Sequence, residues 1–152
     1  MTQKLPAWIE IGDFILALIA GLINVVGLLG FQHQSVSHLT GTVSLFSLKI
    51  VQGEWLAVQH FMGVMLCFFL GAMLSGLIIQ NATLKLGRRY SVALFIESLL
   101  LIFALIMLQG NYSAGDFWAS AACGLQNAMI STYSGAVIRT THVTGTVTDL
   151  GA

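Results

Sequence analysis

Long apolar runs alternate with short polar stretches along most of the chain. Four of these runs are long, and they cover residues 11–31, 58–79, 91–108 and 117–138. A helix that crosses a bilayer needs about 20 apolar residues. The four runs therefore predict four membrane-spanning helices.

A fifth apolar segment, residues 39–51, lies between the first two runs. Its length of about 13 residues gives a helix of about 20 Å, whereas a bilayer core is about 30 Å thick. We interpret it as a half-length or re-entrant helix, and a tilted span is the alternative. The second long run carries two pairs of small residues, Gly71/Ser75 and Ala72/Gly76, a pattern typical of closely packed membrane helices.

Composition supports the same fold class. Of the 152 residues 57% are hydrophobic and 8% are charged, and six basic and six acidic side chains give a net charge of zero. A soluble domain carries about 25% charged residues. The apolar content excludes a disordered chain, and without a basic excess we expect no nucleic-acid partner. The sequence predicts an all-α integral membrane protein, a polytopic helical bundle forming a single transmembrane domain over residues 1–152, with the lipid bilayer as its partner.

Charged and sulfur-containing residues refine this picture. Basic residues Lys85, Arg88 and Arg89 lie between the second and third long runs, residues 109–116 contain none, and Arg139 follows the fourth run. By the positive-inside rule the first and last of these places are cytoplasmic and the middle one is external. The two cysteines lie inside apolar runs, where we expect packing residues rather than a disulfide.

The chain contains an internal repeat. Three blocks recur in the same order: GDF at residues 12–14 and 115–117, GL(I/Q)N at 21–24 and 124–127, and H(L/V)TGTV(S/T) at 38–44 and 142–148. The first two blocks share an offset of 103 residues and the third has an offset of 104. Repeat one then covers about residues 12–114, and a truncated repeat two covers about residues 115–152.

The orientation of the two copies depends on the short segment. If it does not span, each copy crosses the membrane three times and the second copy is inverted, as in many secondary transporters. If it spans, the copies are parallel. We favour the inverted arrangement, because the segment is short and Lys4 is then cytoplasmic. Because the second short helix is cut off, we expect weak stability or a homo-oligomer for the 152-residue form.

The two HxTGTV blocks are the most specific polar feature. Each follows a long run and opens a short helix, whose N-terminal N–H groups suit an anion or a polar ligand. Alternatively, the threonines are N-caps, the glycines are packing residues and the histidines are interfacial. The candidate substrate-binding residues are His38, Thr40, Gly41, Thr42, Thr141, His142, Thr144, Gly145 and Thr146 from the blocks, with Asn24, Gln126 and Asn127 from the long runs.

The polar residues inside the runs have two interpretations each. An unpaired amide in hydrocarbon costs several kcal/mol, so the three amides either contact substrate or clamp helices together. Glu97, inside the third run, is a candidate proton-coupling group or a neutral or arginine-paired residue near the cytoplasmic face. Asp13 and Asp116 begin spans, where an acid favours the helix N-terminus. Asp149 has a leucine, Leu45, as its counterpart.

Catalytic and metal signatures are missing from the sequence. The four histidines His33, His38, His60 and His142 have no ligand spacing with cysteines or carboxylates. We expect no metal, no cofactor and no enzymatic activity.

Two stretches resemble a known family. GLQNA at residues 124–128 and RTTHVTGTVTDLG at 139–151 resemble the signature of the YoaK-like bacterial inner-membrane proteins, a domain of unknown function. The resemblance covers the whole chain and extends to Gly12 and to the block at 40–42, where members more often have Thr-Gly-Asn, so that Thr42 departs from the pattern. It implies a multi-pass bacterial inner-membrane protein, longer than this chain, with no established substrate.

These observations support one functional hypothesis and two alternatives. The first is a small secondary-transporter-like protein for a small polar or anionic solute, held at the two short-helix starts. The second is a non-transporting scaffold or sensor that binds a partner or lipid. An integral-membrane enzyme is third, because no catalytic group supports it.

Overall fold

The structure is a computed structural model of the chain. It describes residues 7–29, 35–79 and 88–133, together with residues 148 and 151. Within these ranges the chain forms five helices: α1 (Ala7–Leu29), α2 (Leu39–Gln52), α3 (Trp55–Ile78), α4 (Arg88–Gln109) and α5 (Gly115–Tyr133). The described part of each long apolar run lies, apart from Ile79, in one of the four longer helices, and the short segment forms α2, so the all-helical class is confirmed.

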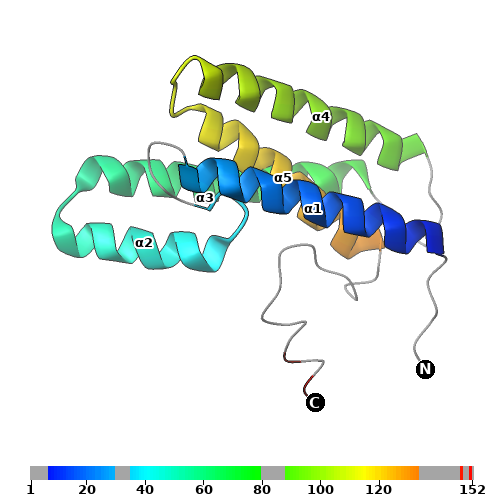
Figure 1. Ribbon diagram of the computed structural model, residues 1–152, viewed down its shortest axis with the longest axis horizontal. Helices are drawn as coiled ribbons and strands as arrows, with labels where there is room; N and C mark the ends of the chain where they lie inside the picture. The colour runs from blue at the N-terminus through cyan, green and yellow to red at the C-terminus, as the bar shows by residue number, and fades with distance from the viewer. Residues whose placement is uncertain (1–6, 30–34, 80–87, 134–147, 149–150, 152) are drawn as a thin grey trace.

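The helices lie roughly along the long axis of the molecule, and their directions define the topology (Figure 1). In that view α1 and α2 both run from right to left, α3 runs from left to right, α4 returns to the left, and α5 runs to the right. Helix α2 therefore continues in the direction of α1 instead of reversing it. As a result α1 and α5 are antiparallel, whereas α3 and α5 run in the same direction.

Helix α5 is the centre of the bundle. It packs on α1, α3 and α4, while α2 packs on α3. One cluster of buried side chains at the α4–α5 contact includes Tyr90, Ala93 and Leu125. A second cluster of buried side chains lies between α3 and α5 and includes Val36, Phe68 and Cys123. Three other helices cover α5. Its surface is therefore buried although α5 is the least apolar of the long helices.

A tight turn joins α2 to α3. Gly53 adopts a left-handed conformation with φ of 73°, and its N–H donates to the Ile50 carbonyl at 3.1 Å, which ends α2. A left-handed residue after a helix is favourable for glycine because it has no Cβ. Lys49 and Glu54 then form an ion pair of 2.7 Å across the turn. This turn fixes α2 and the first half of α3 as an antiparallel hairpin.

Glycine permits a very close crossing of α3 and α5. A Cβ at Gly71 would collide with the Ala121 carbonyl oxygen, and a Cβ at Gly124 would collide with the Phe68 carbonyl oxygen. Each glycine therefore lies against the backbone of the other helix. This is the role expected of the Gly71/Ser75 pair, because small residues allow membrane helices to approach. By contrast, a Cβ at Gly76 would meet nothing within 4 Å.

Two of the described helices are long and apolar enough to cross a membrane, namely α3 and residues Arg89–Gln109 of α4. Helix α1 contains a shorter apolar stretch, Phe14–Leu29. The four runs predicted four spanning helices, so the other two spans remain a prediction.

Candidate functional site

The described part of the junction between α1 and α2, residues 35–38, is not helical, and we call it the α1–α2 break. Val36 and Ser37 are buried although they are not helical. The Ser120 hydroxyl of α5 lies 3.2 Å from the Val36 carbonyl oxygen and 2.9 Å from the Val64 carbonyl oxygen, and it donates to these two acceptors. Since Val64 lies near the middle of α3, the break is held at mid-height between α3 and α5.

Asn24 organises the break from α1. Its Oδ1 accepts the Ser37 backbone N–H at 2.9 Å and the Ser35 hydroxyl at 2.8 Å, and its Nδ2 donates to the Ser37 hydroxyl at 2.5 Å. One amide side chain thus replaces the hydrogen bonds that a continuous helix would give. Asn24 was a candidate for either substrate contact or clamping, and in this structure its polar atoms clamp the chain.

Thr42 joins the break to the first turn of α2. Its hydroxyl is fully buried and donates to the Ser35 carbonyl at 2.9 Å, with the His38 carbonyl at 3.3 Å as a second acceptor. Its backbone N–H donates to the His38 carbonyl at 3.1 Å. Thr42 is therefore a structural residue of this junction, and its hydroxyl faces the interior.

The start of α2 itself is open. The N-cap residue is His38, which makes no side-chain capping bond in the described region. Thr40 lies inside the first turn, so the alternative that made it the N-cap is wrong. His38, Thr40 and Gly41 are exposed, and a Cβ at Gly41 would meet nothing within 4 Å, so Gly41 is not a packing residue. Within the described residues, the first-turn N–H groups of α2 therefore have no side-chain cap.

The amides of α5 lie in other contacts. Gln126 is buried, and its Nε2 donates to the Leu16 carbonyl of α1 at 2.9 Å, which clamps α5 to α1. The Oδ1 of Asn127 is buried and has no hydrogen-bond partner within the described part of the chain. An unpaired buried acceptor costs about 1–3 kcal/mol, so Asn127 is the α5 amide for which the described residues supply no acceptor contact.

Glu97 is buried in the side of α4 that packs on α5. Its Oε2 has no partner among the described residues, and its carboxyl group is close enough to Cys123 of α5 for an electrostatic interaction. No ion pair joins it to Arg89, the one arginine whose side chain the structure describes, so the arginine-paired alternative stays a prediction. Glu97 stands apart from the α1–α2 break, on a different contact of α5.

A buried histidine–aspartate pair was not predicted from the sequence. His60 of α3 and Asp116 in the first turn of α5 approach to 3.1 Å between Nε2 and Oδ2, and both side chains are almost fully buried. The His60 ring also lies 4.9 Å from the Phe117 ring, between centroids. The only sequence signal was one ionisable residue near the start of each of the two runs, 58–79 and 117–138. The expectation that Asp116 starts a helix is confirmed.

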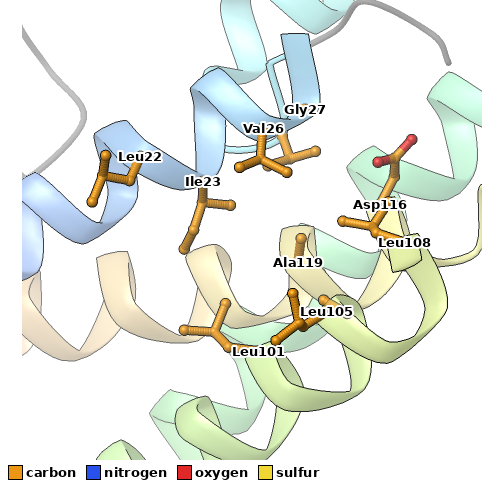
Figure 2. Close-up of a pocket in the computed structure, with 11 residues that line it drawn as sticks. Leu22, Ile23, Val26, Gly27, Leu101, Leu105, Leu108, Asp116 and Ala119 are labelled. Carbon is orange, nitrogen blue, oxygen red and sulfur yellow. The ribbon is translucent and has the colours of Figure 1, made fainter. Parts of the chain in front are cut away.

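An apolar cleft lies between α1, α4 and α5 (Figure 2). Its volume is about 210 Å³. Leu22, Ile23 and Val26 of α1 face Leu101 and Leu105 of α4 across it, while Ala119 forms its floor and Asp116 stands at one end. The cleft exists because α1 packs on α5 but not on α4 in the described region.

Several sequence predictions fall outside the described residues. These are the second-copy site residues Thr141, His142, Thr144, Gly145 and Thr146, the acid Asp149, and the basic residues Lys4, Lys85 and Arg139, and the side chain of Asp13 is likewise outside. Within the described part, no group of three or more His, Cys, Asp or Glu side chains has a geometry that could hold a metal ion.

In the described residues the protein is an all-helical bundle with two helices long and apolar enough to cross a membrane and a polar, non-helical segment at residues 35–38. The chain belongs to the family described as "Protein of unknown function (DUF1275)", whose model matches residues 14–152. No curated protein and no solved structure matches the chain. The resemblance is therefore confirmed as membership of a family without known function, and the YoaK-like name remains a prediction.

Proposed function

We propose that the protein is a multi-pass protein of a bacterial inner membrane that carries a small polar or anionic solute and has no enzymatic activity. The observation that supports this most is the α1–α2 break held at mid-height between α3 and α5. Non-helical backbone at membrane depth is tolerated only where protein buries it or where it lines a cavity. In secondary transporters such broken helices form the solute site.

The membrane location is supported by the outer surface of the helices. Large apolar side chains such as Leu29, Val51 and Leu56 are exposed by 78%, 85% and 83%. A soluble monomer rarely exposes large contiguous apolar surface. Lipid acyl chains are the natural environment for these residues, and we place all four long helices in the bilayer.

The solute would bind at the open first turn of α2. Its N–H groups and the partial positive charge of the helix N-terminus favour an anion or a polar oxygen. Exposed Gly41 leaves room for the solute, and Thr40 offers a hydroxyl beside it. The second HxTGTV block would complete the site. The antiparallel directions of α1 and α5 favour inverted copies, which would bring this block to the site from the opposite side (Figure 1).

Charge movement in proteoliposomes tests this function. On a solid-supported membrane, concentration jumps of phosphate, acetate or chloride should produce a saturable current. The double variant Thr40→Val, Gly41→Leu should abolish it, because the leucine occupies the space before the first turn of α2. Gly76→Leu on α3 is the matched control, since it also projects into open space, and it should keep the current. A current that survives the double variant overturns the proposal, and absence of current for all three anions overturns its anionic form.

A non-transporting, lipid-binding role is the second candidate, and the apolar cleft favours it. The cleft between α1, α4 and α5 could hold an acyl chain, because almost all its lining side chains are apolar. Ala119→Phe would fill it from the floor. A co-purified lipid that native mass spectrometry detects in the parent protein, and not in Ala119→Phe, would support this role if no anion current is measured.

A further inference from the structure

The α5 surface that packs on α3 has a sequence counterpart on α1. At the offset of 103 residues, Phe117, Ala121 and Gly124 correspond to Phe14, Leu18 and Gly21. On α5 all three touch α3: a Cβ at Gly63 would lie 2.8 Å from the Phe117 ring, while the backbones at Ala121 and Gly124 meet those at Gly71 and Phe68. This surface makes the closest helix–helix contact that the structure describes.

On the corresponding surface of α1 none of the other described helices packs. Phe14 is 70% exposed and Leu18 is 55% exposed. Gly21 is exposed as well, and a Cβ there would meet nothing within 4 Å. The three residues follow the i, i+4, i+7 spacing of one helical face. Among the described helices α1 packs only on α5, and it does so through other residues, including Leu16.

We propose that Phe14, Leu18 and Gly21 form a docking face for a membrane helix of the α3 type. The partner is an apolar helix that carries a glycine or another small residue where α3 has Gly71. Its backbone can then approach the α1 backbone at Leu18, as Gly71 approaches Ala121, while its counterpart of Phe68 lies against Gly21. It runs parallel to α1, because α3 and α5 run in the same direction where they cross (Figure 1). This inference depends on the proposed membrane location and not on transport.

A second copy of this chain does not fit as the partner. Copies inserted with the same orientation in one membrane present α3 antiparallel to α1, since the two helices run in opposite directions within the chain (Figure 1). The Gly71 surface of α3 is also already covered by α5. The docking face therefore requires a separate helix with the α3 pattern.

A peptide with the sequence of residues 55–78 serves as the probe, because α3 is the helix that α5 recognises. The full chain carries a donor fluorophore near the start of α1 and the peptide carries an acceptor at either end, both in phosphatidylcholine liposomes. We expect saturable energy transfer, and stronger transfer when the acceptor is at the peptide N-terminus. Gly21→Leu in the protein, or Gly71→Leu in the peptide, should weaken binding by about tenfold or more, because a bulky side chain separates the two backbones.

Gly76→Leu in the protein is the matched control and should leave binding unchanged, since that site is equally open. Gly21→Leu should also leave the unfolding temperature of the protein unchanged, which separates loss of docking from loss of fold. Three outcomes overturn the proposal: no saturable transfer with the parent protein, equal binding by Gly21→Leu, or self-association of the protein that Gly21→Leu abolishes. None of these measurements depends on solute flux, so a failure here is distinct from a failure of the proposed transport.

Discussion

The Nε2 of His60 and the Oδ2 of Asp116 lie 3.1 Å apart in a region from which water is almost completely excluded. The two residues are far apart in sequence, and their contact fixes the first turn of α5 against the second turn of α3. The Phe117 ring packs on the His60 ring beside the pair. A polar contact buried at this position determines where α5 begins relative to α3.

Replacement of Asp116 by alanine should destabilise the protein by about 1–3 kcal/mol, because it leaves the His60 ring nitrogen buried without this acceptor. Asp116→Asn should lose less, since the amide oxygen can still accept. Unfolding of the detergent-solubilised protein by increasing sodium dodecyl sulfate gives both values. Equal stability of the alanine variant and the parent protein would show that the contact contributes nothing.

Two glycines of α3, five residues apart in the sequence, should respond differently to alanine. Gly71→Ala should cost about 1–3 kcal/mol, because the new methyl group collides with the Ala121 carbonyl and the helices must separate. Gly76→Ala should be neutral or stabilise the protein by up to about 1 kcal/mol, since its Cβ enters open space and alanine is the better helix former. The same unfolding assay measures both variants. A similar loss in both would mean that helix propensity and not the crossing decides the effect.

The apolar runs of the chain predicted the helices well, because a helix end depends on local signals. The short segment was expected at residues 39–51, and α2 covers Leu39–Gln52, where Gly53 ends the helix through its own backbone geometry. The direction of α2 could not be predicted. It depends on Asn24, whose amide forms hydrogen bonds with Ser35 and Ser37, more than ten positions further along the chain.

The candidate site was predicted less well for the same reason. The sequence identified Asn24 and Gln126 as buried amides, but their partners, the Ser37 backbone and the Leu16 carbonyl, depend on how α1 packs. The sequence did not show that His60 and Asp116 are partners, because only the fold brings the two side chains into contact. Residue types within an apolar run thus show that a polar contact is required, whereas only the packing shows which contact it is.

Asn24→Ala should open the α1–α2 break. The Ser37 N–H and the Ser35 hydroxyl lose their acceptor, and each buried group left unpaired costs about 1–3 kcal/mol. Hydrogen exchange of the Ser37 amide, followed by mass spectrometry of peptides that cover residues 30–40, should accelerate strongly. Ser47→Ala is the control, because that exposed hydroxyl bonds only to its own helix at Val43, and it should leave this exchange unchanged. Unchanged exchange in Asn24→Ala would contradict the assigned role.

Glu97→Leu should stabilise the protein. One carboxyl oxygen of Glu97 is buried without a partner in the described region, and a buried unpaired polar group costs about 1–3 kcal/mol that an apolar side chain of similar volume avoids. If Glu97 takes part in solute coupling, the same variant should lose the anion current while it gains stability, a trade-off common at functional sites. A decrease in stability on sodium dodecyl sulfate unfolding would show that Glu97 has a structural partner.

The last prediction concerns which side of the membrane each turn faces. In Figure 1 the α2–α3 turn and the α4–α5 turn lie at the same end of the molecule, while α1 and α4 begin at the other end. If the broken α1–α2 segment crosses the membrane once, a residue before α1 and a residue at the start of α4 share the cytoplasmic side. If α2 spans by itself, the N-terminus moves to the outside.

Single cysteines in a background with Cys67→Ala and Cys123→Ala distinguish these topologies. Thr2→Cys and Arg89→Cys should react with a membrane-impermeant maleimide only after the cells are opened, whereas Glu54→Cys and Asn111→Cys should react in intact spheroplasts. Glu54 and Asn111 are exposed in the structure, so reagent access to them is not limited by packing. Labelling of Thr2→Cys and Glu54→Cys from the same side would make α2 a full span. It would also make the two copies parallel and remove the basis for a solute site at a broken helix.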